Sequence, residues 1–256
     1  MRALRHAALS LASLALPLLA ASCSSSTTGT PDPDAGTTTD GGTVGSNEAK
    51  QNGRVIGALD KLEIANATVS IAGKSVVTKA DGTYEIVVPK NTPYSMIVSH
   101  DEHYRLNEQE WIVKSDAFPR GDTSLLSKDT ANLLASFLPP RDAAKGLLVV
   151  RIVPMPPCDT EDGSTLAIEP KGASKLTYFA GGRPNQSATS AKKGEAFAAA
   201  FSDVDPGVNV KVTVTSPLCQ QLPFPVDFDG VTYPGNQKTE PGEVLSYVRV
   251  FIGPKK

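Results

Sequence analysis

The densest group of side chains that could do chemistry is His100-Asp101-Glu102-His103. Imidazoles and carboxylates bind zinc, but a zinc site needs three or four protein ligands. Side chains alternate between the two faces of an extended strand, so the two imidazoles converge only if the chain turns here. Further acidic ligands are available at Glu108, Asp116 and Asp122, although no motif fixes them near the histidines. We therefore predict a charged surface loop without a metal or cofactor, and we keep a metal site as the alternative.

Two other stretches are rich in carboxylates and precede a glycine. They are Asp159-Thr160-Glu161-Asp162-Gly163 and Asp227-Phe228-Asp229-Gly230. Calcium binds several oxygen ligands and could combine such carboxylates with backbone carbonyls. Acidic residues beside glycine are also typical of ordinary solvated turns. We predict solvated turns at both places, with calcium binding as the alternative.

The motifs of nucleophilic and phosphate-binding enzymes are missing from the sequence. It has no Gly-x-Ser-x-Gly elbow and no Gly-x-x-x-x-Gly-Lys loop. A serine nucleophile would have to use His100 or His103 as its base, and no motif suggests that role. The aromatic residues that could stack on a sugar are few: Trp111, Tyr178, Phe179 and Tyr233. In a sandwich such residues more often fill the core, so we predict no catalytic residues and a protein that is not an enzyme.

The charge balance argues against nucleic-acid binding. The 256 residues include 25 Lys and Arg against 27 Asp and Glu, which gives a formal charge of −2. Loss of the first 22 residues, which carry two arginines and no acid, would make it −4. A net-acidic chain without a basic block binds phosphate backbones poorly. The 21 Gly and 20 Pro residues favour turns and strands.

The N-terminus has the pattern of a secretory signal. Arg2 and Arg5 precede an apolar run over 7–20, which ends in the small residues Ala20-Ala21-Ser22. The run is too short to cross the hydrocarbon core, which needs about 20 residues. We therefore expect residues 1–22 to be an export signal that is removed.

The stretch Leu19-Ala20-Ala21-Ser22-Cys23 resembles the lipobox of bacterial lipoproteins. The resemblance implies cleavage before Cys23, a diacylglycerol on its thiol and a fatty acyl group such as palmitate on its amine. Several acyl chains on one residue anchor a protein stably. Ser24 after the cysteine implies the outer membrane, facing either the periplasm or the surface. The alternative is a secreted protein cut near Ala21, with Cys23 as an unused thiol.

The segment that follows is predicted to be a disordered tether over residues 23–50. Of the 27 residues 24–50, eleven are Ser or Thr, five are Gly, and Val44 is the only large aliphatic residue. Such a composition cannot bury enough apolar surface to offset its chain entropy. The tether would let the folded part stand away from the membrane.

The rest of the chain reads as an all-β protein with one helix. Apolar and polar residues alternate in short stretches separated by turns: 68–71, 84–88, 94–98, 197–201 and 208–214. Residues 147–153 are almost continuously apolar, as in a strand covered on both faces. Leucines between 125 and 138 have helical spacing, with Asp122 or Ser124 as the cap and Pro139-Pro140 as the stop. They predict a helical connector over 121–145.

A faint repeat predicts two small sandwiches, over 51–120 and 146–256. The first copy carries Gly53-Arg54-Val55-Ile56-Gly57, Ala67-Thr68-Val69-Ser70-Ile71 and Thr78-Lys79-Ala80-Asp81-Gly82-Thr83-Tyr84. These residues resemble the carboxypeptidase regulatory-like family. The resemblance implies a transthyretin-like, immunoglobulin-like β-sandwich that serves as an accessory or binding module and brings no catalytic residues.

A lipidated Cys23 leaves two cysteines, Cys158 and Cys219. Two thiols in an oxidising envelope compartment most simply pair, and we predict that they form a disulfide. The bond would stabilise the fold by about 4 kcal/mol in the chain-entropy model. The alternative is two free thiols.

Together these features predict a membrane-anchored lipoprotein of the cell envelope that works as a non-enzymatic binding or scaffolding module. Its partners would be the membrane, through the lipid on Cys23, and an envelope protein or polysaccharide. Sheet edges and the loops at the ends of the sandwiches are the expected contact sites. The first alternative is a carbohydrate-binding protein, and the second is a hydrolase accessory or an enzyme.

Overall fold

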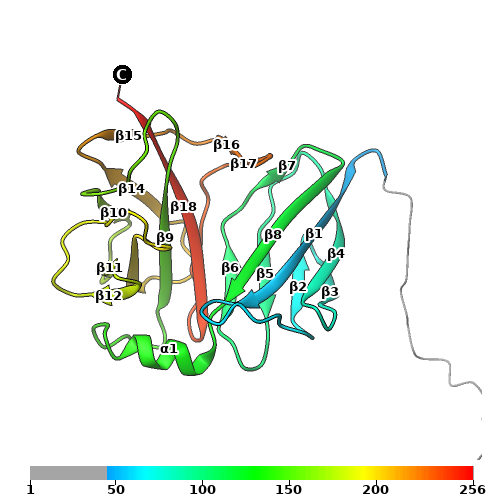
Figure 1. Cartoon of the computed structure of the whole chain (residues 1–256), viewed down its shortest axis with the longest axis horizontal. Coiled ribbons are helices and arrows are strands. Elements are labelled where there is room, and N and C mark those ends of the chain that lie inside the picture. The colour runs from blue at the N-terminus through cyan, green and yellow to red at the C-terminus, as the bar shows by residue number, and fades with distance from the viewer. Residues whose placement is uncertain (1–44, 256) are drawn as a thin grey trace, which may run out of the picture. The chain divides into compact units, whose positions relative to one another are not determined.

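A computed structural model describes residues 45–255 of the chain, as 18 strands and one short helix (Figure 1). The predicted signal over 1–22, the lipidation residue Cys23 and the tether up to residue 44 lie outside the described residues. Strand β1 begins at Glu48, so the prediction of a disordered tether over 23–50 is wrong for its last three residues. Ala49 is buried in the core, and the backbone of Lys50 pairs with strands on both sides. No helix in this described part is long and apolar enough to cross a membrane.

The first sandwich packs a three-stranded sheet against part of a larger one. The small sheet has the order β4-β1-β8 and consists of Glu48–Gly57 (β1), Thr83–Pro89 (β4) and Ala117–Leu125 (β8). The facing strands are Thr68–Ile71 (β2), Lys74–Val77 (β3), Met96–Ser99 (β5) and Arg105–Glu108 (β6). Tyr84, Ile86 and Val88 of β4 point into the shared core, as the alternation in the sequence predicts.

The turn before β4 depends on Gly82. Its φ of +72° lies in the left-handed region that glycine adopts most easily. A Cβ at this position would lie 2.5 Å from the carbonyl oxygen of Val55. Asp81 completes the turn, because its carboxylate accepts a hydrogen bond from the backbone N–H of Thr83 at 3.0 Å. The predicted Asp-Gly turn is confirmed.

The second sandwich packs a two-stranded sheet against the other part of the large sheet. The pair is Thr165–Glu169 (β10) and Lys211–Thr215 (β14). The facing strands are Gly146–Pro154 (β9), Lys175–Ala180 (β11), Arg183–Asn185 (β12) and Ala199–Val204 (β13). Val210, Val212 and Val214 are buried in the second core, as their alternation predicts. The all-β sandwich class is therefore confirmed.

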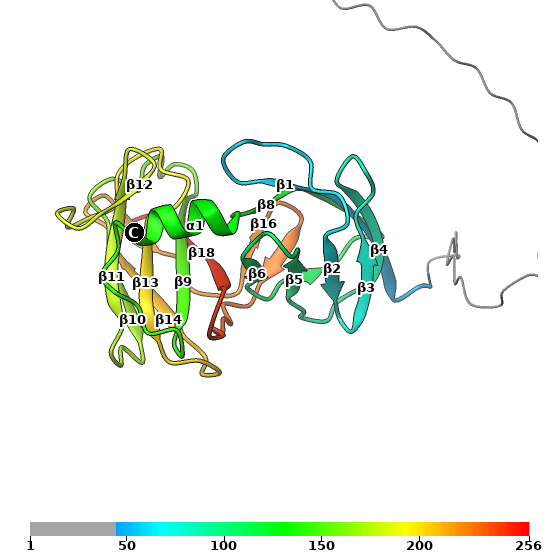
Figure 2. The ribbon, with the colours of Figure 1, turned by 90° about the horizontal axis from the view of Figure 1, so that it is seen from below.

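One strand belongs to both sandwiches. Strand β18, Val244–Pro254, runs parallel to β9 over Leu245–Ile252 and parallel to β6 over Val244–Tyr247. One sheet therefore continues from β12 through β9, β18 and β6 to β3 (Figure 2). The side chains of β18 alternate between the two cores, with Phe251 in the first core and Val250 in the second.

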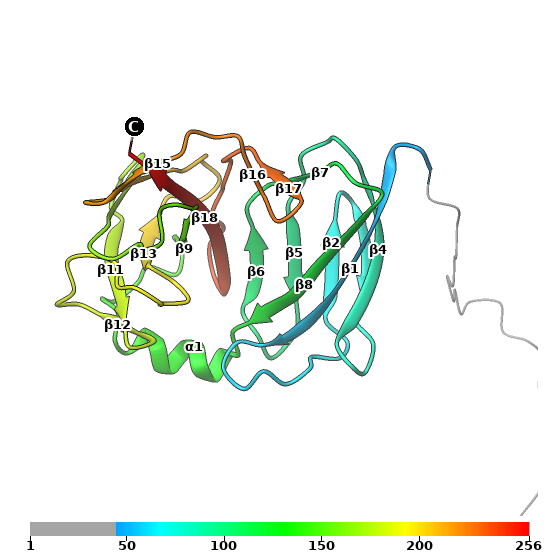
Figure 3. The same ribbon diagram turned by 45° about the horizontal axis from the view of Figure 1, so that its top comes forward.

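The first core also takes residues from a hairpin late in the chain. Val226–Phe228 (β16) and Val231–Tyr233 (β17) form the hairpin, and β17 pairs with Ile112–Val113 (β7). Figure 3 shows this hairpin between the two sandwiches. A further short strand, Cys219–Gln221 (β15), pairs with the end of β18. The predicted ranges 51–120 and 146–256 thus do not separate the two cores, because β16, β17 and β18 supply side chains to the first.

The helix differs from its prediction. Helix α1 covers Lys128–Ala135 at one end of the second sandwich (Figure 2). Its N-cap is Ser127, whose hydroxyl accepts a hydrogen bond from the N–H of Thr130 at 3.2 Å. Asp122 and Ser124, the predicted caps, lie in β8 instead. Leu125 pairs with Gly57 at the end of β8 and is buried in the first core, so it is lost to the helix. Leu133 is 63% exposed, and the predicted apolar stripe is therefore not packed against a sheet.

Candidate functional site

The place where the two sandwiches meet is closed by aromatic side chains. The ring of Phe251 on β18 lies 5.2 Å from that of Tyr233 and 5.4 Å from that of Phe228, measured between centroids. Phe224 approaches the same ring at 6.2 Å. These contacts attach the β16–β17 hairpin to β18 and cover the side of the first core.

A buried ion pair lies beside this aromatic group. Arg120 Nη2 donates to both carboxylate oxygens of Glu108, at 2.6 and 2.7 Å. The exposed fractions of the two side chains are 10% and 4%. Arg120 stands at a shift of register between β1 and β8, next to Gly121 with φ of +73°. Such a bulge redirects one side chain. Here that side chain is Arg120, whose guanidinium lies 5.3 Å from the centroid of the Trp111 ring.

A second arginine comes from the shared strand. Arg249 Nη1 donates to the hydroxyl of Tyr233 at 2.7 Å, and its guanidinium lies over the rings of Tyr233 and Tyr247 at 5.6 and 5.1 Å. The side-chain oxygen of Gln109 accepts from the backbone N–H of Arg249. We call Glu108, Arg120, Tyr233 and Arg249 the junction cluster, because they link β6, β8, β17 and β18.

The electrostatics of the junction cluster favour permanently charged arginines. Burial acts to lower the pKa of Arg120, but the Glu108 carboxylate outweighs it and the pKa is raised. The pKa of Arg249 is also raised, although burial opposes this, through Tyr247 and Glu108. Burial raises the pKa of Tyr233, which therefore keeps its proton at neutral pH. A charged guanidinium has no lone pair to act as a base, so the cluster is suited to holding strands together.

A polar groove of about 540 Å³ opens near the junction. Asn107 Nδ2 donates to Glu240 Oε1 at 3.2 Å, and Asn236 Nδ2 donates to Glu110 Oε2 at 2.9 Å. The other lining residues come from β5, the residue before it and two loops: Ser95, Ile97, Pro206, Gly207, Asn209, Gln237, Lys238, Thr239 and Pro241. Amides, hydroxyls and carboxylates side by side can hydrogen-bond a neutral polar ligand.

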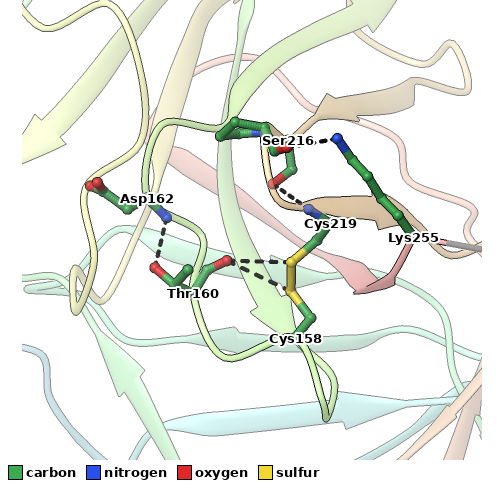
Figure 4. The surroundings of a disulfide bond; sticks show 7 residues. Cys158, Thr160, Asp162, Ser216, Cys219 and Lys255 are labelled. Atoms are coloured by element: carbon green, nitrogen blue, oxygen red, sulfur yellow. Dashed lines mark hydrogen bonds between the residues drawn. A yellow bond between two sulfur atoms is a disulfide. The ribbon is translucent and has the colours of Figure 1, made fainter.

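Cys158 and Cys219 form the predicted disulfide, with 6.1 Å between their Cα atoms (Figure 4). Both sulfur atoms lie close to the carbonyl oxygen of Thr160, at 3.7 and 3.8 Å. The N–H of Cys219 donates to the hydroxyl of Ser216 at 3.2 Å. The bond ties the loop after β9 to the start of β15, within the second core.

The acidic turns have structural partners. Glu161 accepts from the N–H of Gly194 at 2.8 Å. Asp227 accepts from the hydroxyl of Thr232 and from Lys114 Nζ, the latter at 3.1 Å. Over residues 45–255 no group of three or more His, Cys, Asp or Glu is arranged to hold a metal ion. These carboxylates therefore tie the acidic turns to neighbouring segments of the fold.

The chain does turn at the histidine motif. The N–H of His103 donates to the carbonyl of His100 at 3.1 Å, and the two Nδ1 atoms lie 3.1 Å apart. The rings are half-buried, with centroids 4.9 Å apart. The chain therefore makes the turn that the two imidazoles need in order to converge. The four aromatic residues considered for sugar stacking are all buried instead, as expected for core residues: Trp111, Tyr178, Phe179 and Tyr233.

Sequence reasoning missed the junction cluster. Arg120 and Glu108 are ordinary charged residues in the sequence, and only the register shift in β8 brings them together. The only available signal was an arginine within the apolar stretch 244–252, where a charge needs a buried partner.

Comparisons with known proteins do not assign a family. No family model matches the sequence, and no curated protein matches it. Among solved structures, the chain is similar to the Bacillus anthracis TIE protein, with 12% identity and a TM-score of 0.27 over 81% of this chain. It is similar to a streptococcal ancillary pilin with 8% identity and a TM-score of 0.26 over 82%. For the shaft pilin SpaA from Lactobacillus rhamnosus GG the values are 7%, 0.24 and 82%.

The chain spans 34% of the length of the first of these structures, 64% of the second and 98% of the third. The function proposed below therefore depends on the chain's own residues.

Proposed function

We propose that this chain is a lipid-anchored protein of the bacterial cell envelope, and that its folded part is a rigid, non-enzymatic scaffold that binds an envelope partner. The observation that carries the proposal is the shared strand β18, which is hydrogen-bonded to β9 of one sandwich and β6 of the other. Two modules joined only by a linker would move independently. Two modules joined through one sheet keep their contact surfaces in a fixed arrangement.

Rigidity favours scaffolding for an energetic reason. A partner that contacts two mobile modules must order them on binding, and that ordering opposes association. Here the shared sheet, the junction cluster and the aromatic contacts of Phe251 hold the two sandwiches together before any partner arrives. The expected contact sites are the outer edges of the large sheet, β3 and β12, whose backbone groups have no further strand beside them in the described sheet.

The anchor part of the proposal depends on the resemblance to a lipobox at Leu19–Cys23. It is tested by expressing the full chain and its Cys23→Ala variant in a Gram-negative host. We expect the native protein in the outer-membrane fraction, with a mass that includes a diacylglycerol and an amide-linked acyl chain. The variant should lose these groups and leave the membrane. Native protein that is soluble and free of acyl groups would overturn the anchor.

The scaffold part is tested with a photo-crosslinking residue at Ser75, on edge strand β3. We expect it to crosslink one reproducible envelope component in intact cells. The matched control is the same label at Lys171, an exposed position in the turn after β10. An identical product at both positions, or none at Ser75, would count against recognition through the sheet edge.

A second function, carbohydrate binding, is favoured by one observation, the polar groove lined by Asn107, Glu110 and Asn236. Its amides and carboxylates match the alternating donors and acceptors of a neutral envelope polysaccharide. The test is retention on peptidoglycan and on a glycan array. Retention by the native chain that Asn236→Ala weakens would support it. Equal retention of both proteins, or none, would exclude this groove.

A further inference from the structure

The turn between β5 and β6 places two imidazole nitrogens as a chelating pair. His100 Nδ1 and His103 Nδ1 are 3.1 Å apart, and their ring planes are inclined by 77°. Zinc-to-imidazole distances are about 2.0–2.1 Å. If an ion lies about 2.05 Å from both nitrogens, the angle nitrogen–ion–nitrogen is about 98°. This value lies between square-planar and tetrahedral geometry, so both nitrogens can bind one ion once the rings rotate to direct both lone pairs at it.

The turn is held in this shape from several sides. The N–H of Glu102 donates to His100 Nδ1 at 3.3 Å, within the turn itself. On the other side, the N–H of Lys128 donates to the carbonyl of Glu102 at 2.9 Å. The N–H of Tyr104 donates to the carbonyl of Leu126 at 2.9 Å, and His103 forms a β-bridge with Ser127. The backbone positions of both histidines are therefore fixed before an ion binds.

We propose that His100 and His103 form a surface site for one divalent transition-metal cation of the Cu²⁺, Ni²⁺ or Zn²⁺ class. Imidazole nitrogen prefers these ions to Ca²⁺ and Mg²⁺, and the usual order of affinity makes Cu²⁺ the strongest. The two histidines supply two coordination positions, fewer than the three or four protein ligands of an ordinary zinc site, so we expect Zn²⁺ to bind more weakly than Cu²⁺. The remaining positions are open to water or to a donor atom from a partner. The site is independent of the scaffold function proposed above.

Binding requires one rearrangement of protons. In the free turn the two Nδ1 atoms are at hydrogen-bond distance, so one of them carries a proton and donates a hydrogen bond to the other. When both nitrogens bind the metal, that proton moves to Nε2 of the same ring, and both imidazoles stay neutral. The N–H of Glu102 also gives up its bond to His100 Nδ1. No electron is transferred and no other reactant is needed.

The test is a titration of the full chain, purified from the cell envelope, with Cu²⁺, Ni²⁺ and Zn²⁺ in a buffer that does not bind metals. Calorimetry should give one ion per chain, with Cu²⁺ bound most tightly. The EPR spectrum of the Cu²⁺ form should show coupling to two nitrogen nuclei. His100→Gln and His103→Gln should each weaken binding at least about tenfold, while their circular dichroism spectra stay unchanged.

The matched control is Asp101→Asn, which removes an exposed carboxylate from the same turn and leaves both imidazoles. Its affinity for the metal should stay within about threefold of that of the native chain, which corresponds to a change of under 1 kcal/mol in binding free energy. Three results would overturn the proposal: no binding by the native chain, binding that survives both histidine substitutions, or a loss in Asp101→Asn as large as in His103→Gln.

Discussion

Arg120 and Glu108 are paired through a single nitrogen, Nη2, which donates to both oxygens of the carboxylate where the first sandwich meets β18. The pair sits beside a second guanidinium, the half-buried one of Arg249, so one carboxylate faces two positive charges. Glu108 is therefore the group on which the electrostatic balance of the junction cluster depends.

The first prediction concerns that carboxylate. Glu108→Gln leaves the buried guanidinium of Arg120 and the half-buried one of Arg249 without their counter-charge, and removal of one partner of a buried pair costs about 3–5 kcal/mol. Arg120→Met should cost less, because it also removes one of the two positive charges. The free energy of unfolding can be measured in urea from the fluorescence of Trp111, the single tryptophan, whose ring lies 5.3 Å from the guanidinium of Arg120.

The control for this pair is the exposed Arg54–Asp122 bridge, whose side chains are about half solvated. Asp122→Asn should change stability far less, because exposed ion pairs are screened by water and salt. If Glu108→Gln and Asp122→Asn had equal effects, the junction cluster would not be the electrostatic link described here.

Much of the fold follows from the sequence because strands with one buried face leave a pattern of period two. Tyr84, Ile86 and Val88 follow it, and so do Val210, Val212 and Val214. The disulfide followed from there being only two cysteines after Cys23. What the pattern cannot give is the partner of a strand that is buried on both sides. Residues 147–153 read as a covered strand, but nothing in them specifies β18, about 100 positions later, as a neighbour.

The start of the helix and the histidine pair were harder to predict than the strands, for two physical reasons. Leu125 has helical spacing to the leucines after it, yet its pairing in β8 with Gly57 of β1 overrides that local preference. The proximity of His100 and His103 depends on a backbone turn that charged residues do not encode by themselves. In both cases tertiary hydrogen bonds decided the outcome, and periodicity describes only local structure.

The second prediction follows from the shared strand. Phe251→Ala removes a fully buried ring from the first core, which should cost about 3–5 kcal/mol. Because β18 is also part of the second sandwich, both sandwiches should unfold in one transition. Trp111 fluorescence reports the first core, and hydrogen exchange of the Thr213 amide in β14, which pairs with Ala167 of β10, reports the second sandwich. Leu133→Ala, at an exposed position of α1, should leave both signals unchanged. Earlier loss of the Trp111 signal with native protection at Thr213 would contradict a single cooperative unit.

The third prediction concerns the disulfide, whose cysteines are 61 positions apart. Its removal in Cys158→Ala/Cys219→Ala should lower the free energy of unfolding by about 4 kcal/mol, because the unfolded chain regains the entropy of an open loop. Urea curves of the native chain with and without reductant should differ by a similar amount. The urea curve of the double variant should not change when the reductant is added. A native curve that does not respond to complete reduction, verified by mass spectrometry, would show that the bond does not contribute to stability.

The fourth prediction is a pH dependence that originates at Asp203. Burial acts to raise the pKa of this carboxyl, but Lys175 and the N–H of Asp142, both 2.8 Å away, outweigh it and the pKa is lowered. A lowered pKa means that the carboxylate stabilises the folded state above the ordinary value of about 3.9 and that this contribution disappears as the pH falls through the folded-state value. Asp203→Asn suits the test, because asparagine tolerates the φ of +58° found at this position.

The variant should be less stable than the native chain at pH 7. Because the native carboxyl becomes protonated in acid, the difference between the two urea midpoints should shrink below about pH 4. Lys175→Met should show the same trend, since it removes the cation that holds the charge. A midpoint difference that stays constant from pH 7 to pH 2 would show that the substitution acts through packing alone and that the charge of Asp203 does not stabilise the fold.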